Sequence, residues 1–105
     1  AYYFWLFPNI MMNFYPWGLS MNIITPLSFN KTRVEFRSYV WNEELLNTGA
    51  GADINKVELE DQKIIRRVQS GVKSRLYKYG RFSPKMEKGV HHFHTLIQRF
   101  MDSTL

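Results

Sequence analysis

The first half of the chain shows a pattern of apolar and polar positions that predicts antiparallel strands. Four segments are expected to be strands, at residues 2–7, 10–14, 19–25 and 33–41. The first two are apolar at nearly every position, which is typical of strands covered on both faces. The other two alternate, which is typical of strands with one dry face and one wet face. We expect Pro26 to end the third strand, because proline cannot donate a ladder hydrogen bond.

The alternation in the third and fourth segments predicts which side chains share a face. In the third segment, Leu19, Met21 and Ile23 lie on one face, and Ser20 and Asn22 lie on the other. In the fourth segment, the dry face carries Val34, Phe36 and Val40. A connection is expected at residues 42–53, and its residues 47–53 are small and flexible, which favours a mobile segment beside a pocket.

The second half of the chain predicts two helices. The spacing of Asn55 and Glu58 resembles a capping box, and Gly80 is a suitable stop, so the first helix is expected to end near Tyr79. Gly71 would mark a bend or close packing inside it. A second, shorter helix is expected at residues 90–102. The fold class is therefore α+β, with an antiparallel sheet followed by a long helix and a second short helix.

One carboxylate interrupts the apolar stripe of the long helix. At about 100° per residue, Asp61 is centred among the stripe residues Val57, Ile65, Val68 and Val72. A carboxylate facing a core is costly unless it is paired, hydrogen-bonded or bound to a metal. Two interpretations stay open here: a metal ligand, or a structural carboxylate near the helix start that bonds a nearby donor.

The histidines at residues 91, 92 and 94 are a second candidate site. On a helix, His91 and His94 are close enough to share a metal, whereas His92 and His94 point in nearly opposite directions. His94 also lies on the apolar stripe of the second helix. We therefore interpret it as a core histidine bonded to a carbonyl or a carboxylate.

Composition excludes several classes of site and partner. The chain has no cysteine, which excludes disulfides, cysteine–zinc sites and a cysteine nucleophile within it. No apolar run approaches the roughly 20 residues that span a bilayer, so we expect no membrane segment and a cytoplasmic protein. The net charge of +5 permits nucleic acid or an acidic protein as partner. Because the basic residues are spread along the long helix and the following loop, we interpret them as a solvated face and expect no nucleic-acid partner.

Several short motifs carry a family resemblance, in an order and at spacings that are specific together. They are Phe7-Pro8-Asn9, Asn13-Phe14-Tyr15-Pro16-Trp17-Gly18, Glu58 with Glu60-Asp61, Val68-Gln69, Ser74-Arg75-Leu76-Tyr77, Gly80-Arg81-Phe82-Ser83-Pro84, and Glu87 with His91-His92-Phe93-His94. Together they resemble the C-terminal part of the catalytic domain of Rieske-type non-haem iron aromatic-ring-hydroxylating oxygenase α subunits. The branch that includes choline and carnitine monooxygenases is the most similar. The resemblance covers essentially the whole chain.

The resemblance implies a fold, a reaction and a metal. The fold is half of a helix-grip, START-like domain, in which a sheet wraps around the long helix. The reaction activates O₂ at a mononuclear Fe(II) held by two histidines and one carboxylate, and Asp61 occupies the carboxylate position. The two histidines and the [2Fe-2S] Rieske cluster domain are not among residues 1–105, which we expect to be a portion of a longer protein. None of His91, His92 and His94 occupies a ligand position of the family.

The resemblance also implies partners. Electrons would come from NAD(P)H through a separate ferredoxin or flavin reductase, and the whole protein would be a homotrimer. Alone, residues 1–105 should be inactive and prone to self-association, because half of a helix-grip fold exposes a sheet edge and apolar surface.

In the family, the strand after Phe-Pro-Asn lines the substrate pocket. By parity we expect Asn9, Met11 and Asn13 to contact substrate, with Val57 bordering the pocket one helical turn before Asp61. Asn13 could equally be a hydrogen-bonded structural residue. The substrate is either aromatic or a quaternary ammonium compound. The alternative function is a non-enzymatic helix-grip module that binds an apolar ligand and would not need Asp61.

Overall fold

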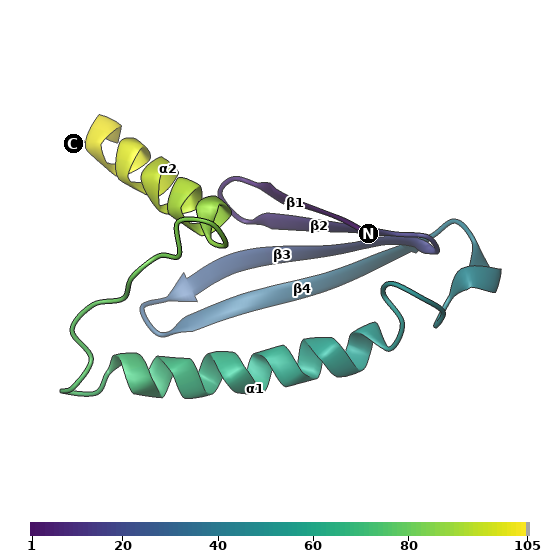
Figure 1. Ribbon diagram of the computed structural model, residues 1–105, viewed down its shortest axis with the longest axis horizontal. Helices are drawn as coiled ribbons and strands as arrows, with labels where there is room; N and C mark the ends of the chain where they lie inside the picture. The colour runs from purple at the N-terminus through teal and green to yellow at the C-terminus, as the bar shows by residue number, and fades with distance from the viewer. Residues whose placement is uncertain (105) are drawn as a thin grey trace. The chain divides into compact units, whose positions relative to one another are not determined.

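The computed structural model describes residues 1–104 of the chain (Figure 1). It divides into two compact units, of which the first is Ala1–Asp53 and the second begins at Ile54. The first unit holds a four-stranded sheet and the second holds two helices. The predicted α+β class is confirmed. The helix-grip arrangement stays a prediction, because each unit is described by itself.

The sheet is an antiparallel meander in which sequence neighbours pair in the order β1-β2-β3-β4. Its strands are β1 (Tyr2–Leu6), β2 (Ile10–Tyr15), β3 (Gly18–Ser28) and β4 (Lys31–Val40). All four predicted strands are therefore confirmed. The expectation that Pro26 ends the third strand was wrong, because β3 continues to Ser28 with an irregularity between Pro26 and Ser28.

Proline is tolerated in β3 because of where its nitrogen points. The Ile24 backbone N–H donates toward β2, to the Asn9 carbonyl at 2.9 Å. Two residues later the Pro26 nitrogen points the same way, since strand residues repeat every second position. The pairing between β2 and β3 ends at Ile10 and Ile23, so no ladder bond is lost at Pro26.

Burial in the sheet differs from the predicted alternation. The most buried side chains of β3 are polar: Ser20 is 1% exposed and Asn22 is 8% exposed. The predicted dry face of β4 was wrong, because Val34, Phe36 and Val40 are all exposed. β4 is an outer strand that pairs only with β3, whereas β3 has a neighbour on both sides. Position in the sheet, and not side-chain polarity, therefore sets burial here.

β1 is the other outer strand, and its side chains are also exposed. The expectation that both of its faces are covered was wrong for this chain, because Tyr2 to Leu6 are exposed along the whole strand. β1 pairs only with β2. The result is a row of aromatic side chains at one edge of the sheet.

Trp17 is the buried apolar side chain of the first unit. It is 2% exposed, and its ring stacks on Tyr15 with the centroids 5.5 Å apart. Its carbonyl accepts the backbone N–H groups of Trp41 and Asn42 at 3.0 and 3.2 Å. Gly51 packs so closely that a Cβ there would lie 2.6 Å from the Trp17 Nε1. The connection after β4 is therefore packed against the sheet at this point, and the expectation of a mobile segment is not supported there.

The second unit contains α1 (Ile54–Val72) and α2 (Lys88–Thr104). The capping role of Asn55 was wrong, because α1 begins before it at Ile54. The predicted end near Tyr79 was also wrong. Ser74 closes a turn directly after α1: its N–H donates to the Gly71 carbonyl and its hydroxyl accepts the Leu76 N–H at 3.2 Å. Such side chain–backbone bonds compete with helix continuation.

α2 matches the predicted second helix within two residues at each end. A reciprocal bond arrangement precedes it. The Ser83 hydroxyl accepts the Met86 N–H at 3.3 Å, and the Glu87 carboxylate accepts the Ser83 N–H at 2.6 Å. This resembles a capping box and explains why the chain turns into a helix here. Over residues 1–104, neither helix has the length and apolar character to cross a membrane.

Candidate functional site

The Asp61 carboxylate lies on α1 with its side chain exposed. The helix itself is confirmed, but the stripe around Asp61 is not buried: Val57 is 49% exposed and Ile65 is 66% exposed. Asp61 is therefore not a costly buried charge in this chain. Among residues 54–104, α2 makes at most a minor contact with α1, and the stripe residues are exposed. The predicted metal role of Asp61 rests on its position alone, and stays a prediction.

Glu58 lies one helical turn before Asp61 and forms an acidic pair with it. Burial raises the pKa of the Glu58 carboxyl, and the nearby charge of Asp61 raises that pKa further. Among residues 1–104, the ion pairs join Glu35 to Arg33 and Arg37 on β4, so no basic side chain neutralises the acidic pair on α1. From its spacing to Asn55, Glu58 was expected to be part of a helix cap. Its spacing of three residues from Asp61 was the available signal for a shared helix face.

The residues of this chain do not complete an iron site. Within the described residues, no three histidine, aspartate or glutamate side chains come together in a way that could hold a metal ion. Non-haem Fe(II) of the facial-triad type needs two histidines and one carboxylate. Asp61 can supply the carboxylate only. We therefore derive no catalytic step through iron from this chain.

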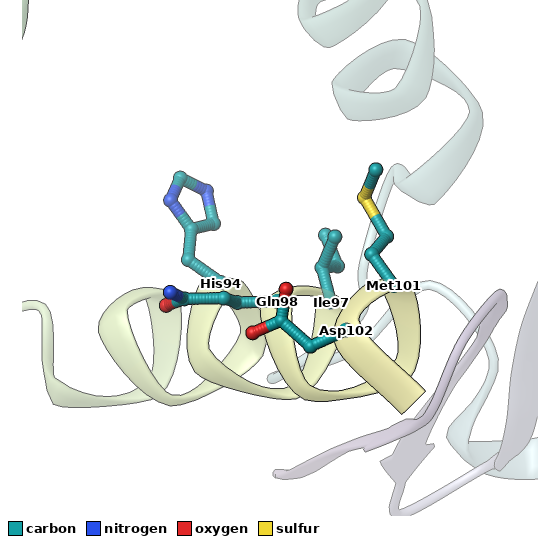
Figure 2. Close-up of a pocket in the computed structure, with 5 residues that line it drawn as sticks. All are labelled: His94, Ile97, Gln98, Met101 and Asp102. Atoms are coloured by element: carbon teal, nitrogen blue, oxygen red, sulfur yellow. The ribbon is translucent and has the colours of Figure 1, made fainter. Parts of the chain in front are cut away.

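His94 is exposed on α2, so its assignment as a core histidine was wrong. Its ring lies edge-on to the Phe82 ring with the centroids 5.1 Å apart, and His91 contacts the same ring at 5.5 Å. The two histidines thus share an aromatic neighbour. Figure 2 shows that His94 also borders a shallow surface hollow on α2, and the other residues lining it are Ile97, Gln98, Met101 and Asp102. Of the described residues that line this hollow, two are titratable, His94 and Asp102, which are too few for a facial triad.

The predicted substrate contacts of the sheet fall into two groups. Met11 and Asn13 are half-buried and share one face of the sheet. Asn9 lies in the turn between β1 and β2, where its Nδ2 donates to the Ile24 carbonyl at 2.9 Å. That bond gives the Asn9 side chain a structural role. Val57 lies on α1, one turn from Asp61. None of these contacts is tested, and they stay predictions.

The face that carries Met11 and Asn13 also carries two side chains that the sequence analysis did not select. Ser20 pairs with Asn13, and Asn22 pairs with Met11. The Ser20 Oγ and the Asn22 Oδ1 are buried and have no hydrogen-bond partner among the described residues. The alternation of β3 placed both residues opposite Leu19, Met21 and Ile23, which suggested a wet face. Only the register between β2 and β3 shows that Ser20 and Asn22 lie beside Asn13 and Met11.

Comparison with known proteins identifies the family. Residues 1–103 match the family described as the ring hydroxylating alpha subunit (catalytic domain). The chain belongs to this family. The resemblance stated from the motifs is thereby confirmed, and the family is one of Rieske non-haem iron oxygenases, which are oxidoreductases.

The chain is also similar to curated plant proteins named choline monooxygenase, chloroplastic. It is 32% identical to the protein of Arabidopsis thaliana over 102 residues, which is 92% of this chain and 24% of that protein. It is 32% identical to the protein of Spinacia oleracea over 105 residues, which is 94% of this chain and 24% of that protein. The chain thus spans about a quarter of the length of these relatives. No solved structure matches this chain significantly.

Proposed function

We propose that residues 1–105 are the C-terminal portion of the catalytic domain of an oxygenase that activates O₂ at a mononuclear Fe(II) and hydroxylates a small organic substrate. The observation that carries the proposal is the position of Asp61. By the motif resemblance it would occupy the carboxylate position of the family, and it is an exposed carboxylate on α1 whose neighbour Glu58 has a raised pKa. An acidic pair without a basic partner is suited to a cation.

Asp61 would be one of three protein ligands, with two histidines coming from outside the described residues. A hard carboxylate oxygen suits Fe(II), and binding the cation would relieve the repulsion between Asp61 and Glu58. Electrons would reach the iron from a [2Fe-2S] Rieske cluster outside this chain. NAD(P)H would supply them through a ferredoxin or flavin reductase, and the whole protein would act as a homotrimer in the cytoplasm.

For the substrate we propose a quaternary ammonium compound as the first candidate, because the curated relatives are named for choline. An aromatic compound is the second. Met11, Asn13, Asn9 and Val57 are the proposed contacts. The aromatic side chains Tyr3 and Trp5, which share a face with Met11 and Asn13, are able to bind an organic cation through their rings.

The alternative is a module that binds an apolar ligand without iron. It is favoured by the same sheet face, which carries no charged side chain along the four strands. In that case Asp61→Ala would leave ligand binding unchanged, and the protein would consume no O₂.

The test is O₂ uptake by the complete polypeptide that carries this chain, reconstituted with Fe(II) and a reductase and supplied with choline. We compare the wild type, Asp61→Ala and Glu60→Ala, because Glu60 is an exposed carboxylate on the same helix. We expect choline-dependent uptake in the wild type and Glu60→Ala, and its loss in Asp61→Ala. Unchanged uptake in Asp61→Ala would overturn the role of Asp61. Absence of O₂ uptake by the wild type, together with apolar-ligand binding that Asp61→Ala leaves unchanged, would favour the module.

A further inference from the structure

One face of the sheet presents a row of uncharged polar side chains across its strands. Residues paired directly in antiparallel strands project to the same face, with Cβ atoms about 5 Å apart. The register places Tyr3 beside Asn13, Asn13 beside Ser20, and Ser20 beside Ser38. We call Asn13, Ser20 and Ser38 the polar row. It crosses three strands of one compact unit.

The adjacent row on the same face holds one more uncharged polar side chain, Asn22. There Trp5 pairs with Met11, Met11 with Asn22, and Asn22 with Phe36. Asn22 therefore lies next to the polar row, between a thioether and an aromatic ring. Apolar side chains thus flank Asn22 on both sides along this row.

Two oxygen atoms in this arrangement lack a hydrogen-bond partner. Ser20 is 1% exposed and Asn22 is 8% exposed, and the Ser20 Oγ and Asn22 Oδ1 are bonded to no described residue. A buried polar atom without a partner is destabilising, so such atoms are rare unless they have a role. Here the two atoms lie in neighbouring rows of one face, which points to a shared role.

The charges on the two faces of the sheet are different. The face with the polar row carries no aspartate, glutamate, lysine or arginine along the four strands. The basic and acidic residues of β4 are at odd positions and lie on the other face: Lys31, Arg33, Glu35 and Arg37. A carboxylate ligand would therefore meet unpaired acceptor oxygens and no cation on the polar-row face, which disfavours it.

We propose that the polar row, together with Asn22, is a subsite that binds a hydroxyl group of an otherwise apolar or cationic substrate. A hydroxyl can donate to the Asn22 Oδ1 or the Ser20 Oγ and accept from the Ser20 hydroxyl or the Asn13 amide. The neighbouring aromatic rings suit the remainder of the ligand. This inference rests on the proposed function for the identity of the substrate, but it concerns recognition and not the metal.

The test uses two cations that differ by one hydroxyl group. Choline carries the hydroxyl, and ethyltrimethylammonium has the same charge and carbon skeleton and lacks only the hydroxyl oxygen. Calorimetric titration of the complete polypeptide with each cation gives a ratio of dissociation constants that reports the hydroxyl contact alone. We expect the wild type to bind choline about tenfold more tightly, which is the value of one good hydrogen bond.

Ser20→Ala removes the central hydroxyl of the row, and Thr25→Val is its matched control because it removes a hydroxyl from the opposite face of the same strand. We expect Ser20→Ala to bring the ratio close to one and to leave ethyltrimethylammonium binding unchanged. Thr25→Val should keep the wild-type ratio. Because the Ser20 Oγ has no hydrogen-bond partner among the described residues 1–104, Ser20→Ala should unfold at the same temperature as the wild type or a higher one.

Ser38→Ala is a second variant at an exposed position of the row, in case Ser20→Ala does not fold. We expect it to lower the ratio several-fold. Equal affinity of the wild type for the two cations would overturn the proposal, and so would a tenfold ratio that survives both variants. Weaker binding of both cations by the same factor would assign the row a structural role only. These outcomes are independent of iron content and O₂ uptake, so the subsite can fail while the proposed function stands, and the reverse.

Discussion

The packing of Gly51 against Trp17 makes a quantitative prediction about the first unit. Gly51 has a φ of 84°, and a Cβ at this residue would lie 2.6 Å from the Trp17 Nε1 and from the Tyr15 Cγ. Placing a side chain at positive φ costs about 1–2 kcal/mol. Overpacking a tight contact adds about 1–3 kcal/mol. Because the Tyr15 and Trp17 rings are stacked, neither can move freely to make room.

Gly49 is a matched control for this substitution. It has a φ of 61°, but nothing lies within 4 Å of a Cβ built there. We therefore expect Gly49→Ala to lower the free energy of unfolding by about 1 kcal/mol, since the stiffer unfolded chain offsets part of the backbone penalty. Gly51→Ala should lower it by about 2–4 kcal/mol.

The assay is urea denaturation of the complete polypeptide, followed by near-ultraviolet circular dichroism of the tryptophans. The midpoint should fall in the order wild type, Gly49→Ala, Gly51→Ala, with an unchanged slope. Equal losses in the two variants would refute the reasoning, because the contact with Trp17 would then contribute nothing.

Two further predictions concern the helices. Glu58→Gln should stabilise the protein at about pH 7, because the raised pKa of Glu58 means that the folded state disfavours its ionised form. The protonated form of Glu58 stabilises the folded state at low pH, and this stabilisation is lost as the pH rises through the raised pKa. Below about pH 4 wild-type Glu58 is protonated, so Glu58→Gln should there be no more stable than the wild type. A stability advantage of equal size at both pH values would contradict this. Ser83→Ala should lower the stability of α2 by about 1 kcal/mol, because it removes the acceptor of the Met86 N–H. The measurement is thermal unfolding followed by the circular dichroism of the helices, with Ser103→Ala as the control because the Ser103 hydroxyl donates to the Phe100 carbonyl. Equal melting temperatures of the two variants would exclude the capping role.

Much of the fold followed from local signals. The strands were predicted well because turn residues such as Pro8 and Gly18 separate apolar segments. The end of α1 was missed because Gly80 was a stronger stop signal than Ser74, whose hydroxyl and backbone close the turn. The position of Pro26 within β3 was missed because tolerance of proline depends on where the neighbouring strand ends, which is a property of register.

The candidate site was predictable in part. The helical periodicity singled out Asp61, and the family resemblance supplied its role. Helical periodicity predicts a buried position for Asp61 only if a core covers the stripe of α1, and Val57 and Ile65 are exposed. Ser20 and Asn22 were not predictable, because alternation gives the two faces of a strand but not which of them is buried.

Iron content is the most direct test of the central claim, that Asp61 is a ligand of a mononuclear iron. The complete polypeptide is reconstituted with Fe(II), and total iron is compared with acid-labile sulfide, which reports the Rieske cluster separately. The account predicts iron beyond the cluster in the wild type and in Glu60→Ala, and only the cluster iron in a folded Asp61→Ala. The same iron in Asp61→Ala as in the wild type would contradict the account and make Asp61 a structural carboxylate.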